Sequence, residues 1–260
     1  MMNKLLLLLS FFSTYALLSC SKTSVPEIAV SNFTDSLKKD LWGYYPFDGS
    51  NFSDLSGNNR HMQGFNGINF TQDSSGIANG ALNFDGIDDF AVIDSGRNFK
   101  EGDFTIFFSF LSRNKKGRIF QKANYNDAKG ASFGFGFDQD LGTQNLHFYI
   151  ANSTNVCNIY TDTTNGTLLQ VITNININKW YNIVLQHSNG IEKVYINGIL
   201  AGSRNTPNKF FTNCTSAPFY LGMWWLGDKR SFSGAIDNLA IYTRSLTENE
   251  IKYISGIRQQ

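Results

Sequence analysis

The chain has 260 residues, of which 42% are hydrophobic, and its formal net charge is +1. This is enough apolar material for one sizeable core. Lysine and arginine form no cluster along the sequence, so the basic stretch typical of nucleic-acid-binding proteins is absent and no nucleic-acid partner is expected. Phenylalanine and glycine each occur 23 times, a profile typical of aromatic β-strands separated by tight turns.

The N-terminus has the features of an exported lipoprotein. Lys4 precedes an apolar run at residues 5–18, which is too short for a membrane span and is typical of a signal peptide. The run ends in Leu-Leu-Ser-Cys, which resembles a bacterial lipobox. We therefore expect a signal peptide at 1–19, lipidation of Cys20 and a polar tether at 20–40. An ordinary secretory signal with an incidental cysteine is the alternative.

Lipidation would place the protein in the bacterial cell envelope, at the outer membrane, with the lipid anchor as its only membrane contact. Two further cysteines, Cys157 and Cys214, form an even pair in an exported chain. Such a pair favours a disulfide, and two buried free thiols are the alternative.

From residue 41 onward the sequence alternates apolar and polar residues between turns, which predicts antiparallel strands. Asn197-Gly198 is a strong hairpin signal because both residues tolerate positive φ. The terminal sequence predicts one short helix, capped by Ser245 with Glu248 in a capping box. No change in composition divides the chain, so we expect one domain at 41–260. The predicted strands are 41–47, 81–84, 89–93, 103–111, 117–122, 131–137, 145–151, 179–187, 191–196, 199–203, 217–223 and 231–244.

The order of these segments is more specific than their composition. LWGYYPFDG (41–49) is followed by GALNFDGIDDFAVI (80–93), KWYNIVLQHSNGIEKVYINGILAG (179–202) and FSGAIDNLAIYTRSLTENEI (232–251). The series resembles the laminin G-like jelly roll of concanavalin A-like lectins and glucanases over nearly all of residues 41–255. The resemblance implies an all-β fold: a two-sheet antiparallel jelly-roll sandwich with one short C-terminal helix.

The same resemblance implies a structural calcium ion. In this family an acidic residue after the first strand and an aspartate of the closing strand ligate calcium together with backbone carbonyls. Asp48 and Asp237 match these two positions, and calcium accepts such oxygen ligands readily. Alternatively, Asp237 caps local backbone amides or pairs with Arg230 or Arg244, and Asp48 is a turn residue.

Adjacent aromatic and polar residues are candidates for a carbohydrate site, because sugar rings stack on aromatic side chains. Trp224 and Trp225 follow a predicted strand, and the side chains of two neighbours in an extended segment point in opposite directions. We therefore expect one of them to be exposed. Tyr125 and Asn126 offer a second platform in a polar segment.

The sequence shows no catalytic signature. The chain has five glutamates, and none forms the Glu-x-Asp-x-(x)-Glu pattern of laminarinase-type glucanases. The aspartate pairs Asp88/Asp89 and Asp138/Asp140 are more typical of turns and loops, although a carboxylate pair assembled from separate strands stays open. We expect a non-catalytic protein that binds a glycan or polysaccharide. The alternatives are a protein-binding adhesin or envelope assembly component and, after these, a glycoside hydrolase or lyase.

Overall fold

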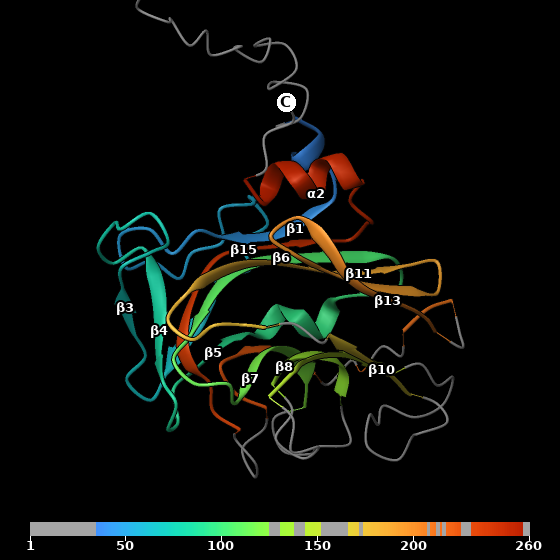
Figure 1. The fold of residues 1–260 in the computed structure, drawn as a ribbon. Coiled ribbons are helices and arrows are strands. Elements are labelled where there is room, and N and C mark those ends of the chain that lie inside the picture. Colours follow the sequence, from blue (N-terminus) through green and yellow to red (C-terminus); the bar gives the residue numbers. More distant parts are fainter. Residues whose placement is uncertain are drawn as a thin grey trace, which may run out of the picture.

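The computed structural model describes residues 35–124, 131–137, 144–151, 166–171, 174–206, 209–211, 214, 217–224 and 230–256. These residues form two antiparallel sheets that pack face to face, with one short helix, α2, outside them (Figure 1). The predicted fold class is thus confirmed.

Sheet 1 has eight strands, seven of which follow one another in hydrogen-bonded order, while β1 pairs with β15. In that order its strands are β13 (Ile199–Asn205), β12 (Ile191–Ile196), β11 (Trp180–Ser188), β6 (Phe104–Ser112), β15 (Ser233–Tyr242), β4 (Ala81–Asp85) and β3 (Asn69–Thr71), with β1 (Leu41–Tyr45) beside β15.

Sheet 2 has seven strands and lies opposite sheet 1. Its order is β10 (Gly166–Val171), β9 (Leu146–Ala151), β8 (Ala131–Phe137), β7 (Arg118–Ala123), β14 (Phe219–Leu221), β5 (Phe90–Ile93) and β2 (Gln63–Phe65). A 3₁₀ turn, η1 (Asp94–Asn98), follows β5.

Three short or irregular strands had no clear signal in the sequence. β2 and β3 have three residues each and lie at sheet edges, where half-exposed side chains show no alternation. β10, the edge strand of sheet 2, follows an Asn- and Thr-rich stretch that reads as loop. Edge strands bury less apolar surface than central strands, so their sequences are less constrained.

Aromatic rings from β6 and β8 meet across the interior. Phe104 stacks on Phe133 with ring centroids 4.7 Å apart, and Phe108 meets Phe135 edge-on at 5.9 Å. Phe110 meets Phe137 at 6.5 Å. Each such pair contributes about 1 kcal/mol beyond the burial of its surface, so the row fixes the two sheets against each other.

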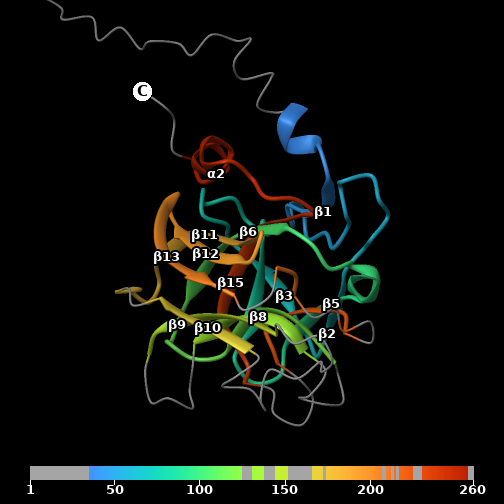
Figure 2. The same cartoon turned by 90° about the vertical axis from the view of Figure 1, so that its right-hand side faces the viewer.

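The outer face of sheet 1 is covered by α2 (Glu248–Ile254). Phe107, Val184 and Tyr195 of this face pack with Ile251 of the helix. Residues 35–38 form a helical turn beside α2, and Leu37 joins the same cluster (Figures 1 and 2). The folded part of the chain therefore includes residues from 35 onward.

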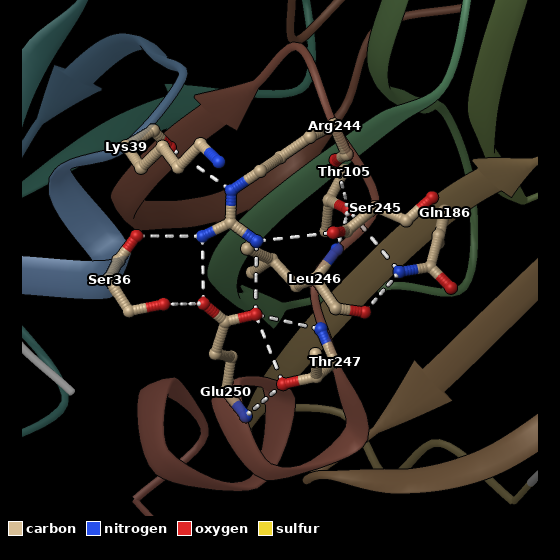
Figure 3. Close-up of polar contacts among 9 residues, drawn as sticks. All are labelled: Ser36, Lys39, Thr105, Gln186, Arg244, Ser245, Leu246, Thr247 and Glu250. Carbon is tan, nitrogen blue, oxygen red and sulfur yellow. Dashed lines mark hydrogen bonds and ion pairs between the residues drawn. The ribbon is translucent and has the colours of Figure 1, made fainter.

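A buried ion pair fastens α2 and the N-terminal turn to sheet 1 (Figure 3). Arg244 donates two hydrogen bonds to the carboxylate of Glu250, at 2.8 and 3.0 Å, and others to the carbonyls of Ser36, Lys39 and Ser245. Burial would raise the pKa of Glu250, but hydrogen bonds from Arg244, from the Ser36 hydroxyl and from a backbone amide lower it to about 2. Both charges are thus fully satisfied within the chain.

The helix begins later than the sequence predicts. Its N-cap is Thr247, whose hydroxyl accepts from the Glu250 backbone amide, and Glu250 accepts from the Thr247 amide in return. Ser245 does not cap the helix, because its hydroxyl donates to Asp103 at 3.2 Å and its carbonyl binds Arg244. The predicted Ser245–Glu248 box is therefore wrong by two residues.

Two ionisable side chains, His187 and Glu192, lie opposite each other on β11 and β12 and are fully buried. His187 stacks on Phe104 in the core, and the Glu192 carboxyl oxygens have no hydrogen-bond partner among the described residues. Burial raises the pKa of Glu192 to about 8, which Arg204 partly opposes, and burial lowers the pKa of His187. Glu192 is therefore protonated in the folded protein at neutral pH.

We predict that Glu192→Gln removes a pH-dependent loss of stability. The folded-state pKa lies above the unfolded value, so wild-type stability is complete at low pH and falls as pH rises toward 8. The unfolding free energy of Glu192→Gln minus that of wild type should rise by about 3 kcal/mol from pH 5 to 7.5 in urea titrations. Taking the difference cancels groups common to both proteins. The exposed Glu248→Gln is the charge control, and an equal rise there would contradict the prediction.

Candidate functional site

The two faces of sheet 2 differ in chemistry. In β8, Phe133, Phe135 and Phe137 point into the core, so strand alternation places Gly134 and Gly136 on the outer face. The neighbouring strands place polar and aromatic side chains around these glycines. The outer face of sheet 2 is therefore the part of the sandwich where a binding site can lie outside the core.

Gly134 makes room for a tyrosine. Gln121 of β7 and Tyr149 of β9 are its cross-strand partners. A Cβ atom at position 134 would lie 2.6 Å from the Tyr149 hydroxyl oxygen, which means that the tyrosine ring lies across the glycine. A larger residue at this position would displace the ring.

Arg118 lies one row further along, opposite Gly136. Its guanidinium carbon is 4.9 Å from the ring centroid of Tyr149 and 4.9 Å from that of Trp224. The residue is 4% exposed, and its Nε and Nη1 atoms have no hydrogen-bond partner in the part of the chain that the structure describes. The arginine is thus held by two aromatic rings with two donor nitrogens unused.

Gln121 fixes the segment that carries Trp224. Its amide nitrogen donates to the carbonyl of Met223 at 2.7 Å and to that of Trp224, while its Oε1 atom has no partner. Arg230 lies on the same indole ring, with its guanidinium carbon 4.2 Å from the centroid. We refer to Arg118, Gln121, Tyr149, Trp224 and Arg230 as the Arg118 cluster.

The predicted carbohydrate residues are only partly described. Trp224 belongs to the cluster and is 1% exposed. Trp225, Tyr125 and Asn126 lie outside the described residues, and their predicted roles stay predictions. The sequence had pointed to the segment around Trp224 but not to Arg118, Gln121 or Tyr149, which come from the two central strands β7 and β9.

Asp237 is buried beside a β-bulge of β15, at 2% exposure. Its two carboxylate oxygens accept from the backbone amide of Asn238 at 2.7 Å and from its side-chain amide at 2.8 Å. Burial raises the pKa of Asp237 to about 7, and the negative charges of Asp73 and Asp48 act in the same direction. Local capping, the predicted alternative to a metal, is therefore present, while Arg244 pairs with Glu250 instead.

The negative charges that raise the pKa of Asp237 are also relevant to the predicted calcium site. Asp48 is exposed at the end of the segment after β1, close enough for its charge to act on Asp237 and on the Tyr44 hydroxyl. Carboxylates that repel one another next to a buried aspartate are a suitable donor set for a hard cation. Asp48 and Asp237 are oxygen donors of the kind that calcium prefers, and its binding here stays a prediction.

A second acidic group could also hold a metal ion. Asp85, Asp88 and Asp89 follow one another around the β4–β5 turn, with one carboxylate oxygen from each within 4.8 Å of the others. Asp85 and Asp89 also accept hydrogen bonds from backbone amides of the same turn, as the turn interpretation of Asp88/Asp89 predicts. Asp138 and Asp140 lie outside the described residues.

The predicted cysteine roles are not tested by the described part of the chain. Cys214 is buried, whereas Cys20 and Cys157 lie outside the described residues, so lipidation and the disulfide stay predictions. Within the described residues no helix has the length and apolar character required to cross a membrane.

A sequence model described as the concanavalin A-like lectin/glucanases superfamily, of laminin G type, matches residues 84–252. The chain belongs to the concanavalin A-like lectin/glucanase superfamily. This match includes β6–β9 and β14, and with them the whole Arg118 cluster. No curated protein sequence matches the chain.

Solved structures show the same superfamily fold at low sequence identity. Domain 4 of AbnA, a GH43 extracellular arabinanase from Geobacillus stearothermophilus in complex with arabinotriose, has a TM-score of 0.61 and 18% identity, over 83% of this chain and 98% of that one. The binding domain of Paraclostridial Mosquitocidal Protein 1 has a TM-score of 0.63 and 17% identity, over 84% of this chain and 52% of that one.

A structure of botulinum neurotoxin type C, whose cell entry depends on interaction with two ganglioside molecules, has a TM-score of 0.62 and 13% identity. The alignment covers 86% of this chain and 52% of that one. The chain therefore spans almost the whole arabinanase domain but only about half of the length of the toxin chains. At these identities the likeness establishes the fold alone.

We predict that the two glycines of β8 differ in their tolerance of alanine. A Cβ at Gly136 would lie 2.6 Å from the Gly117 carbonyl oxygen and 2.8 Å from the Arg118 Cα, atoms that cannot move without shifting the backbone. Gly136→Ala should lower the unfolding free energy by about 2 kcal/mol. Gly134→Ala meets only the movable end of the Tyr149 ring and should cost less than half as much. Urea unfolding of both variants checks this, and equal losses would contradict it.

Proposed function

We propose that the protein binds carbohydrate, without catalysis, on the outer face of sheet 2, and that a lipid on Cys20 anchors it to the bacterial envelope. One observation carries the binding site. The outer face of sheet 1 is covered by α2, and its polar side chains such as Gln186 and Thr105 have partners there, whereas that of sheet 2 carries buried polar atoms of Arg118 and Gln121 that have no partner among the described residues.

The chemistry of the Arg118 cluster suits a sugar. Hydroxyl groups of a sugar both donate and accept, so the Arg118 donors and the free Gln121 oxygen offer complementary partners. Tyr149 adds an aromatic ring that can contact the apolar face of a sugar ring. Buried polar groups without partners are rare in native proteins, which favours a ligand that supplies the missing hydrogen bonds.

The superfamily relatives support the same proposal. One structural neighbour is a domain in complex with arabinotriose, and another belongs to a toxin that interacts with gangliosides. Glycan recognition is thus found on this fold in proteins of otherwise different activity. Fold alone does not give function, so the argument depends on the Arg118 cluster itself.

Binding to a panel of neutral and charged polysaccharides, among them arabinan, galactan and glucans, tests the proposal. The purified protein should be retained on at least one, without producing new reducing ends. Tyr149→Ala should weaken binding about tenfold or more, the scale expected for losing one buried polar and stacking partner. Tyr253→Ala, which removes a half-exposed ring from α2 on the opposite side of the sandwich, should bind as wild type does.

Other outcomes of this panel are informative. Retention that is unchanged in Tyr149→Ala, with the fold verified by circular dichroism, would remove the Arg118 cluster from the site. New reducing ends would overturn the non-catalytic assignment. A failure to bind any polysaccharide, charged ones included, would favour the protein-binding alternative.

We also propose that Asp48 and Asp237 hold a structural calcium ion. Such an ion would neutralise a buried carboxylate and tie β15 to the segment after β1, so its role would be stability rather than catalysis. The acidic group at Asp85, Asp88 and Asp89 is the competing location.

Thermal melts in excess calcium and in excess chelator distinguish the two locations. Calcium should raise the Tm of wild type and of Asp85→Asn by about 5 °C or more, as expected for a ligand well above its Kd. It should have little effect on Asp237→Asn. The reverse pattern would place the ion at Asp85, and no calcium effect on wild type would refute the site.

A further inference from the structure

We propose that the ligand of the Arg118 cluster is an anionic glycan, whose carboxylate or sulfate group pairs with Arg118. This inference rests on the proposed function and specifies the class of sugar polymer. The observation behind it is a buried guanidinium group for which the described chain supplies no acceptor.

The burial of Arg118 requires a compensating group. The guanidinium stays protonated at any physiological pH, so the charge cannot be removed by titration. Arg118 is 4% exposed, and its side chain forms no ion pair within the described residues. Leaving a charge buried and unpaired is costly, and the two aromatic rings compensate for only part of that cost.

A second arginine in the same protein shows what full compensation looks like. Arg244 is also largely buried, and it forms two hydrogen bonds to the Glu250 carboxylate and three to backbone carbonyls (Figure 3). Those contacts hold α2 in place. Arg118 has no such carboxylate among the described residues, although its fork of N–H donors has the same capacity to bind one.

The surroundings of Arg118 add to the preference for an anion. Arg230 lies on the same Trp224 ring, at 4.2 Å, and its carbonyl accepts from the Arg118 backbone amide at 2.8 Å. Two guanidinium groups therefore share one indole ring. An acidic group of a ligand would be attracted by these two neighbouring guanidinium groups.

The aromatic rings define the direction of approach. Tyr149 and Trp224 each lie 4.9 Å from the guanidinium carbon, at a distance typical of rings that contact its face. Nε and Nη1 remain as donors among the described residues, and a planar carboxylate or a tetrahedral sulfate can accept hydrogen bonds from such a pair. Lysine would keep the charge at this position but not the fork.

Matched polymer pairs test the inference on the unmodified protein. Polygalacturonate is compared with its methyl ester, and dextran sulfate with dextran, so each pair differs in charge but not in backbone sugar. Wild type should bind the anionic member of at least one pair at least tenfold more tightly. That advantage should shrink as sodium chloride is raised, because exposed parts of the interaction are screened. The two pairs separate carboxylate from sulfate recognition.

Variants connect this preference to Arg118. Arg118→Gln should lose tenfold to a hundredfold in affinity for the anionic polymer, the range expected for charge-assisted hydrogen bonds. Arg118→Lys should retain part of the affinity. Lys252→Gln, which removes one positive charge from α2 on the other side of the sandwich, should bind as wild type does.

The outcomes separate this inference from the proposed function. Equal affinity for both members of each pair, or an anion preference unchanged in Arg118→Gln, would overturn the inference while glycan binding stands. No binding to any neutral or anionic polymer would overturn both. If Arg118→Gln does not fold, the inference is still tested by the matched pairs on wild type and on Arg118→Lys, since the lysine keeps a long, positively charged side chain at this position.

Discussion

The row of phenylalanine contacts between β6 and β8 is the constraint on which the rest of the structure depends. Phe104, Phe108 and Phe110 of one sheet meet Phe133, Phe135 and Phe137 of the other. Because side chains alternate along a strand, the three phenylalanines of this row point to one face of β8, and Gly134 and Gly136 between them lie on the other. Neighbouring strands must therefore supply the functional groups of the outer face, and the missing side chains of the glycines provide the space in which those groups lie.

Irregular strand pairing changes the face of a sheet to which a charged side chain points. The pairing of β7 with β8 shifts between Arg118 and Phe120, so these two residues face opposite sides although they are two positions apart. A second bulge in β15 follows Asp237, where Asn238 adopts a positive φ of 55°. β-Bulges commonly redirect side chains near binding sites. In this protein the β7 bulge places Arg118 in the Arg118 cluster, and the β15 bulge follows the buried Asp237 directly.

Most of the fold was predictable, because its signals are local. Alternation identified the central strands, and the hairpin at Asn197-Gly198 joins β12 to β13 as predicted. The helix was placed two residues early, because the contact of Ser245 with Asp103 lies far away in sequence. The site was less predictable for a related reason. Strict alternation puts Arg118 on the same face as Phe120, in the core, and only the bulge brings it beside Tyr149 and Trp224.

The two buried arginines show how one residue type serves both stability and recognition. Arg244 pairs with Glu250, a carboxylate of the same chain, so its hydrogen bonds are made within the protein and contribute to the stability of the fold. Where the described residues supply no such carboxylate, as at Arg118, an incompletely satisfied guanidinium lowers the stability of the free protein. A two-sheet core of this size tolerates a cost of that order, because it is small beside the apolar burial around the phenylalanine row. An anion that pairs with Arg118 then recovers this free energy on binding. The same interaction would therefore provide affinity and stabilise the folded state, since a ligand bound only by the native protein shifts the folding equilibrium toward it.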